Sequence, residues 1–192
     1  MAATESRMLK LGTRAPAFAL PDAFGKKHAL SDAKGSDAVV VMFICNHCPF
    51  VKHVRPELAR IGKDYASRNV AIFAINSNDP VAHPGDNAEG MKKEVAIWGY
   101  SFPYLIDSEQ IVAKAYQAAC TPDFYVFDRD LQLRYRGQLD GSRPSNDIPV
   151  SGADLRAAID TIITGGRVSE RQVPSIGCNI KWKPGNEPDW YR

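Results

Sequence analysis

Two cysteines lie three residues apart in the segment FICNHCPFVKH, which covers residues 43–53. Cys45 and Cys48 enclose His47, and Pro49 follows them directly. A cysteine thiolate attacks disulfides and peroxides, and it is also a ligand for soft metal ions. The spacing therefore admits three interpretations: a redox-active pair, part of a metal site, or two buried thiols without chemistry.

The segment lies where an apolar run meets a predicted helix. Residues 38–44, AVVVMFI, are β-branched or apolar throughout, which predicts a buried central strand. From Pro49 to Arg68 apolar residues recur at spacings of three and four, which predicts a helix that starts at Pro49 and kinks or breaks at Pro56. Cys48 is then the N-cap, where the helix dipole and unpaired amides favour an anion. We therefore expect the pKa of Cys48 to lie below the usual ~8.5 of a free thiol.

Three basic residues occupy the first two turns of this helix: Lys52, His53 and Arg55. Cations at a helix N-terminus oppose the dipole, so helix stability does not explain them. They predict a neighbouring anion, either the Cys48 thiolate or an acidic substrate.

A turn at Asn46-His47 would bring the sulfur atoms of Cys45 and Cys48 within bonding distance, because a disulfide requires Cα atoms within roughly 7 Å of each other. A Cys-x-x-Cys pair at a strand–helix junction is typical of a redox site. His47 would adjust the pKa of Cys48 or carry a proton.

Strands and helices alternate along the rest of the chain, which predicts a three-layer α/β/α sandwich. The predicted elements are an N-terminal hairpin within residues 11–32, a buried strand at 70–76, a helix near 87–98, a short strand at 102–107, a helix at 108–117, two strands within 123–137 and a last helix at 151–166. We expect residues 1–166 to form one domain. Residues 167–192 are rich in proline and tryptophan without periodicity, which predicts an irregular extension packed on that domain.

The composition of the 192 residues is that of a folded domain, with 44% hydrophobic and 24% charged residues. The net charge of +2 and the lack of a basic stripe argue against nucleic acid as a partner. The first 20 residues contain no apolar stretch behind a basic start, and no apolar run is long enough to span a bilayer. We expect a cytoplasmic protein without a membrane partner, in which cysteines are catalytic or metal-binding rather than structural.

Other polar residues have structural interpretations. His83 is expected in a loop, and Asp107, Asp123 and Asp128 are expected in turns.

Three segments together resemble a known family. LGTRAPAFAL (residues 11–20) resembles the G-x-x-A-P-x-F opening of peroxiredoxins and of membrane-anchored thioredoxin-like reductases. VVVMFICNHCPFVKH (39–53) resembles their central strand and active-site helix, and CTPDFYVFD (120–128) resembles the segment whose cis-proline faces the active cysteine. Over about residues 10–165 the chain is thus similar to the AhpC/TSA-related, peroxiredoxin-like redoxins, which implies a thioredoxin-like fold.

The resemblance places Cys48, rather than Cys45, on the nucleophilic cysteine. Val51 then takes the resolving position of thioredoxins, and Cys45 takes the place of the threonine or serine of peroxiredoxins. Val41 replaces the peroxiredoxin proline, and Pro122 stands near the position of their arginine. Because those groups stabilise a departing oxyanion, fast peroxide reduction is not expected.

The leading hypothesis is therefore a thiol–disulfide oxidoreductase without a bound cofactor. Cys48 would attack as the thiolate, Cys45 would resolve the mixed disulfide, and Thr121-Pro122 would present its backbone to the substrate. The substrate would be a protein thiol or a small-molecule thiol or peroxide, and a reductant of the thioredoxin or glutathione type would restore the enzyme.

Two alternatives stay open. In an antioxidant thiol peroxidase or a redox sensor, Cys48 would become a sulfenic acid that Cys45, Cys120 or Cys178 captures. In a metal-binding protein, Cys45, Cys48 and His47 would join Cys120 or Cys178 around zinc or Cu(I). Against this second alternative, the sequence offers no second closely spaced pair of ligands.

Overall fold

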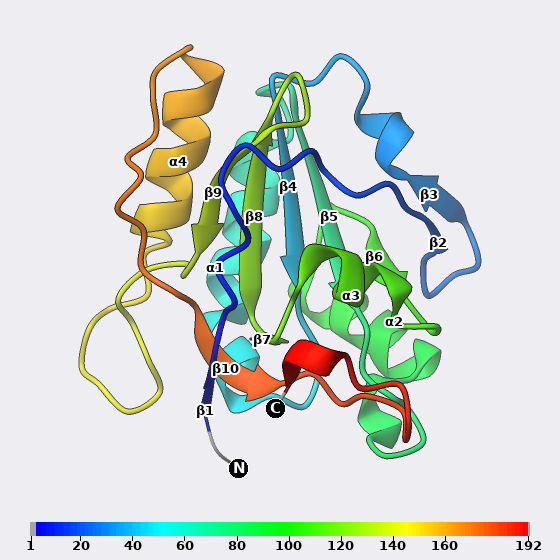
Figure 1. The fold of residues 1–192 in the computed structure, drawn as a ribbon. Coiled ribbons are helices and arrows are strands. Elements are labelled where there is room, and N and C mark those ends of the chain that lie inside the picture. The colour runs from blue at the N-terminus through cyan, green and yellow to red at the C-terminus, as the bar shows by residue number, and fades with distance from the viewer. Residues whose placement is uncertain (1–2, 192) are drawn as a thin grey trace.

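A mixed sheet of five strands lies at the centre of the computed structural model, which describes residues 3–191 (Figure 1). Its strand order is β6-β5-β4-β8-β9. The strands are β4 (Ala38–Phe43), β5 (Val70–Asn76), β6 (Tyr104–Ile106), β8 (Asp123–Asp128) and β9 (Leu133–Gly137). β4, β5 and β6 are parallel to one another, whereas β8 and β9 run antiparallel to their neighbours.

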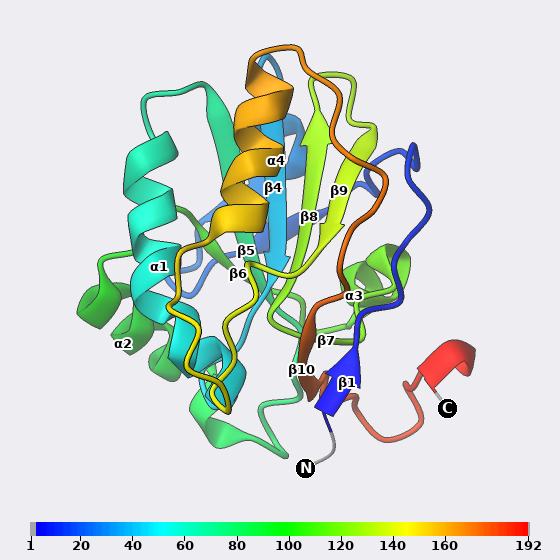
Figure 2. The ribbon, with the colours of Figure 1, turned by 90° about the vertical axis from the view of Figure 1, so that its left-hand side faces the viewer.

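Helices cover both faces of this sheet. They are α1 (Pro49–Tyr65), α2 (Ala88–Trp98), α3 (Ile111–Tyr116) and α4 (Ala153–Ile163), with short 3-10 turns η1 (Leu30–Ala33), η2 (Pro84–Asp86) and η3 (Asp189–Tyr191). α1 and α4 lie on one face and α3 lies on the other (Figure 2). The predicted three-layer sandwich of the thioredoxin type is confirmed.

Strand β4 is the centre of the core. Val40 and Met42 pack toward α1 and α4, while Val39, Val41 and Phe43 pack toward α3 and the N-terminal segment. All of them are buried. Burial on both faces explains why the strand is a continuous apolar run rather than an alternating one.

Helix α1 begins at Pro49 with Cys48 as its N-cap, as predicted. The predicted kink or break at Pro56 does not interrupt it, since the helix continues past this residue to Tyr65. It ends short of the predicted Arg68. Packing of the apolar face of α1 against the sheet holds the helix together where proline removes one backbone hydrogen bond.

The two ends of the chain add small sheets. β2 (Ala19–Pro21) and β3 (Lys27–Ala29) form the predicted hairpin. The extension, expected to be irregular, contains strand β10 (Ile176–Asn179), which lies between β1 (Ala3–Glu5) and β7 (Cys120–Thr121). Figure 1 shows this sheet below the central one, beside both termini. Four residues are too few to show a strand periodicity, so only the non-local pairing reveals β10.

The extension continues past β10 along the α3 side of the molecule. Ile180 and Trp182 are buried in the apolar layer that also contains residues of α3. Among the helices in residues 3–191, none is long and apolar enough to cross a membrane.

Candidate active site

Three of the four thiols, those of Cys45, Cys48 and Cys178, lie in one buried cluster near the carboxyl end of β4. Cys45 follows this strand, Cys48 caps α1, Cys120 lies in β7 and Cys178 lies in β10. All four are free, and their exposed fractions are 1%, 0%, 0% and 4% in that order. Cys48 is therefore shielded from solvent on every side.

Neighbouring thiols and backbone groups lower the pKa of Cys48. The thiol of Cys45 lowers the pKa of Cys48 most, the thiol and backbone of Cys178 and the backbone of Val51 lower it further, and burial opposes them. The result is a pKa of about 5. In the protonated form, the thiol of Cys48 donates to the carbonyl oxygen of Thr121 at 3.2 Å. The direction agrees with the N-cap prediction, but two further thiols contribute to it.

Cys45 has the opposite protonation preference. Burial raises its pKa well above that of an ordinary thiol, and the negative charges of Cys48 and Asp86 raise it further. Its Sγ lies 3.2 Å from the hydroxyl oxygen of Thr121. At neutral pH the pair is thus one thiolate, on Cys48, beside one thiol, on Cys45.

The segment Thr121-Pro122 has the cis peptide bond that the resemblance implies. Thr121 contacts both cysteines of the pair, Cys48 through its carbonyl oxygen and Cys45 through its hydroxyl group. Side chains of successive strand residues point to opposite sides. Accordingly, Cys120 turns the other way and donates to the carbonyl oxygen of Pro122 at 3.8 Å.

Cys120 is a poor candidate for a freely reacting thiol. Burial raises its pKa well above the usual value, and the nearby charges of Asp123 and Cys48 raise it further. Of the two distant cysteines considered from the sequence, Cys178 is the one that shares a buried cluster with Cys48 and lowers its pKa.

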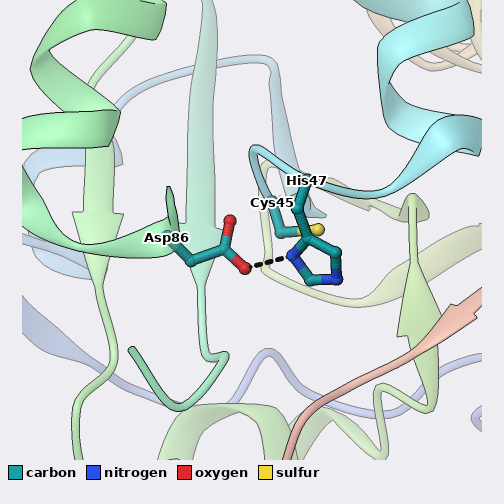
Figure 3. A group of neighbouring side chains, drawn as sticks. All are labelled: Cys45, His47 and Asp86. Carbon is teal, nitrogen blue, oxygen red and sulfur yellow. Dashed lines mark hydrogen bonds and ion pairs between the residues drawn. The ribbon is translucent and has the colours of Figure 1, made fainter. Parts of the chain in front are cut away.

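His47 is held by a buried carboxylate. Its Nδ1 lies 2.5 Å from Oδ2 of Asp86, and its ring stacks on that of His83 with centroids 4.2 Å apart. Figure 3 shows the Asp86 carboxylate aimed at the His47 ring, with Cys45 beside it. Nε2 of His47 is buried and has no hydrogen-bond partner within residues 3–191. The histidine is therefore oriented next to Cys45.

Asp86 organises the turn that carries the cysteine pair. Besides His47, it accepts a hydrogen bond from the backbone amide of Asn46 at 2.7 Å and one from Nδ2 of Asn78 at 2.8 Å. Burial raises its pKa, but the bonds from His47 and Asn78 outweigh burial, so the pKa is lowered overall. No local pattern points to Asp86, because it lies in a polar loop far along the chain from Cys45.

Of the three basic residues of α1, Arg55 has a different partner from the predicted thiolate or acidic substrate. Nε of Arg55 lies 2.8 Å from Oε2 of Glu94 in α2, and the guanidinium group also donates to the carbonyl oxygen of Asn46. Arg55 is buried and lies over the ring of Trp98. Its charge is thus matched by Glu94, and it fixes the turn before Cys48.

Asp123 was expected in a turn, and this expectation is wrong. The residue starts β8 and is fully buried, and burial raises its pKa to about 8. The hydroxyl group of Tyr125 donates to its Oδ2 at 2.9 Å. Sequence alone favours turns for aspartate, and only the packing of β8 between two strands places this one inside.

The residues that could bind a metal ion differ from the set predicted from the sequence. Cys45, His47 and Asp86 each offer an atom within 4.8 Å of the other two, whereas the expected ligands Cys48, Cys120 and Cys178 are not part of this group. Sulfur, nitrogen and oxygen donors of this kind suit zinc. However, Asp86 already bonds to His47, and a closed zinc site needs a fourth ligand.

The sequence is similar to known redox proteins. Residues 11–136 match the AhpC/TSA family. The chain is 27% identical over 131 residues to the thiol-disulfide oxidoreductase ResA of Geobacillus kaustophilus, which covers 68% of this chain and 71% of that protein. It is 29% identical over 117 residues to ResA of Bacillus subtilis, covering 61% of each.

Two solved structures resemble nearly the whole chain. An uncharacterized conserved protein from Geobacillus kaustophilus has a TM-score of 0.94 at 57% identity, over 96% of this chain and 98% of that one. A hypothetical protein from Sinorhizobium meliloti has a TM-score of 0.93 at 53% identity, over 95% and 100%. A putative thiol:disulfide interchange protein DsbE from Chlorobium tepidum shares the fold, with a TM-score of 0.64 at 24% identity, over 81% and 99%.

Proposed function

The chain belongs to the AhpC/TSA family, and from this premise we propose that it is a thiol–disulfide oxidoreductase with Cys48 as nucleophile and Cys45 as resolving thiol. One observation carries the proposal. Both sulfur atoms lie 3.2 Å from Thr121, that of Cys45 from the hydroxyl oxygen and that of Cys48 from the carbonyl oxygen, and the pKa values of the two thiols are shifted in opposite directions. At one pH, such a pair contains a thiolate that attacks the substrate and a thiol that can later resolve the mixed disulfide.

The reaction proceeds in two exchanges. The Cys48 thiolate attacks one sulfur of a substrate disulfide, forms a mixed disulfide and releases the first substrate thiolate, which takes up a proton. Cys45 then loses its proton and attacks the Cys48 sulfur, which forms the Cys45–Cys48 bond and releases the second substrate thiol. Two electrons pass to the substrate, and an external thiol reductant of the thioredoxin or glutathione type returns them to the protein.

Charge explains the order of these steps. While Cys48 is a thiolate, its negative charge helps to keep Cys45 protonated. The mixed disulfide removes that charge, so Cys45 becomes easier to deprotonate at the moment when it must attack. His47, which Asp86 orients beside Cys45, is the proton acceptor for this step.

Thr121 contacts both sulfur atoms and keeps them close together. Its hydroxyl group contacts Cys45 and its carbonyl oxygen contacts Cys48. A single residue beside the cis peptide bond thus keeps the resolving thiol near the sulfur that it attacks. This raises the effective concentration of the Cys45 thiol in the second exchange.

The test is thiol mapping after a limited reaction with oxidised glutathione. The reduced protein is mixed with the disulfide, quenched with N-ethylmaleimide, digested and analysed by mass spectrometry. The wild type should contain a Cys45–Cys48 bond, and a variant in which Cys48 is the remaining thiol, Cys45→Ser with Cys120→Ser and Cys178→Ser, should accumulate glutathione on Cys48. Glutathione found on Cys45 in Cys48→Ser at the wild-type rate would contradict the assignment of the nucleophile.

A parallel reaction with hydrogen peroxide separates this function from the peroxidase alternative. Val41 is buried in β4, and Cys45 stands in the place of the peroxiredoxin threonine or serine, so the expected reaction with peroxide is slow. Oxidation of Cys48 by peroxide much faster than by the disulfide would favour the thiol peroxidase instead.

A further inference from the structure

Strand β10 occupies the backbone edge beside the cis-proline, where a substrate was expected to pair. It runs antiparallel to β7, with Cys178 opposite Thr121 and Asn179 opposite Cys120. Its other edge pairs with β1, so β10 is the middle strand of this small sheet. The C-terminal extension therefore fills the position of a substrate strand (Figure 1).

A glycine permits this close approach. A Cβ atom built on Gly177 would lie 2.0 Å from the carbonyl oxygen of Thr121, a distance that no side chain tolerates. Because the backbones are this close, the next residue, Cys178, reaches the site. It pairs with Thr121, whose carbonyl oxygen lies 3.2 Å from the Cys48 sulfur, and it belongs to the same buried cluster as Cys48.

We propose that Cys178 is a third redox thiol, which serves as an internal partner of Cys48 and forms a Cys48–Cys178 disulfide. The inference rests on the proposed function, because it requires Cys48 as the nucleophile. It adds a second route of resolution, through a thiol that is presented on a strand in the way a substrate would be.

Resolution by Cys178 follows the same thiol–disulfide exchange as resolution by Cys45. Cys48 first forms a mixed disulfide with a small disulfide R–S–S–R and releases one RS⁻. The Cys178 thiolate attacks the Cys48 sulfur, the Cys48–R bond breaks, and the leaving RS⁻ takes the proton that Cys178 lost. The products are two RSH and one Cys48–Cys178 bond, and R–S–S–R is the oxidant that accepts the two electrons.

The protonation of Cys178 is consistent with a delayed attack. Burial raises its pKa to about 12, the hydrogen bond and charge of Cys48 contribute to the increase, and the charge of Lys181 lowers it. Both contributions of Cys48 disappear once its sulfur is in a mixed disulfide. Cys45 can later attack the same sulfur and release Cys178, which exchanges one bond for the other.

The decisive experiment uses the full chain with Cys45→Ser and Cys120→Ser, so that Cys48 and Cys178 are the remaining thiols. The folded variant is treated with oxidised glutathione, quenched and mapped by mass spectrometry. We expect peptides linked through Cys48–Cys178 and release of glutathione. Glutathione retained on Cys48 while Cys178 is alkylated would overturn the inference and leave the proposed function standing.

Two further variants, each built on the Cys45→Ser, Cys120→Ser protein, test the geometry. In that background, Cys178→Ser should trap glutathione on Cys48. Adding Gly177→Ala should reduce formation of the Cys48–Cys178 bond severalfold, because the new methyl group forces β10 off Thr121. Gly141→Ala is the matched control, since its Cβ would meet only the Ile148 side chain at 3.7 Å.

The outcomes separate the two proposals. An unchanged yield of the Cys48–Cys178 bond in Gly177→Ala would show that pairing of β10 does not present Cys178, which contradicts the inference. In the wild-type background, Gly177→Ala should still form the Cys45–Cys48 bond, which reports an intact fold and nucleophile. If Cys48 takes up no glutathione in any variant, the proposed function fails, and the inference fails with it.

Discussion

The pKa of Cys48 is lowered by two neighbours in its own turn and by one residue far along the chain. Cys45 follows β4, Val51 lies in the first turn of α1, and Cys178 belongs to β10. The N-cap position alone predicted a lowered pKa, because helix ends favour anions. The structure adds two thiol donors to this effect, and the one from Cys45 is the largest contribution.

Removing the thiol of Cys45 should therefore raise the pKa of Cys48. A hydrogen bond to a charged group contributes about 1.5–3 kcal/mol, so Cys45→Ala is expected to raise this pKa by about 1–2 units. Ultraviolet absorbance of the thiolate, followed against pH, measures the change. Cys120→Ala is the control, because Cys120 hydrogen-bonds to Pro122 rather than to Cys48. Equal titration midpoints in Cys45→Ala and wild type would contradict the assigned donor.

The same thiolate makes the stability of the reduced protein depend on pH. The pKa of Cys48 is about 5 in the folded state and returns to about 8.5 on unfolding. Its stabilising contribution is present in full above the unfolded pKa and is lost as the pH falls through the folded one. The advantage of wild type over Cys48→Ser should thus grow between pH 5 and about 8.5, by at most about 1.4 kcal/mol per pH unit.

Urea unfolding of both reduced proteins across this range measures that difference. Other titrating groups, including Asp86 and Asp123, are common to both chains and largely cancel in the comparison. A difference in the free energy of unfolding that stays constant with pH would show that Cys48 is not a thiolate in the folded protein.

At the scale of elements, the loop before α2 is fastened to the turn that carries the cysteine pair. Asp86 accepts hydrogen bonds from Asn46, His47 and Asn78, and its side chain is completely buried. A carboxylate satisfied in this way ties η2, the end of β5 and the active-site turn together. The loop therefore positions catalytic groups although it contains no nucleophile.

Replacing this carboxylate should loosen the turn. Asp86→Asn keeps the size of the side chain but removes the charge and one acceptor, so we expect a loss of about 2–4 kcal/mol in the free energy of unfolding. Asp147→Asn, at an exposed position, should change it by less than about 0.5 kcal/mol. Urea denaturation measures both variants, and equal stabilities would contradict the role assigned to Asp86.

Elements with a local signature were predictable, and those defined by distant partners were not. The apolar run of β4, Pro49 at the start of α1 and the Thr121-Pro122 pair each follow from a few neighbouring residues. By contrast, β10 is defined by its pairing with β7 and β1. Asp86 likewise gains its role from groups that the fold brings near it. Its segment has the composition of an ordinary loop, so the sequence does not reveal this role.

At the scale of the whole molecule, the C-terminal extension connects the thiol site with the opposite face of the sheet. After β10 it passes Gln110, whose Nε2 donates to the carbonyl oxygens of Ser77 and Lys181. Oε1 of Gln110 accepts from the backbone amide of Lys183 and from Nδ2 of Asn186. A single buried amide side chain thus fixes the extension just beyond Cys178.

Gln110→Ala should release this part of the extension while the central sheet stays folded. Loss of these partly buried hydrogen bonds costs about 1–3 kcal/mol of local stability, so amide exchange at Lys181 and Lys183 should accelerate by about tenfold or more. Glu109→Ala is the control, because its exposed ion pair with Lys183 at 3.5 Å contributes little. Hydrogen exchange followed by mass spectrometry measures the effect.

Because β10 covers the buried Cys48, alkylation of Cys48 by iodoacetamide should also become faster in Gln110→Ala. Faster exchange without faster alkylation would show that the extension beyond β10 moves independently of the strand that covers the nucleophile.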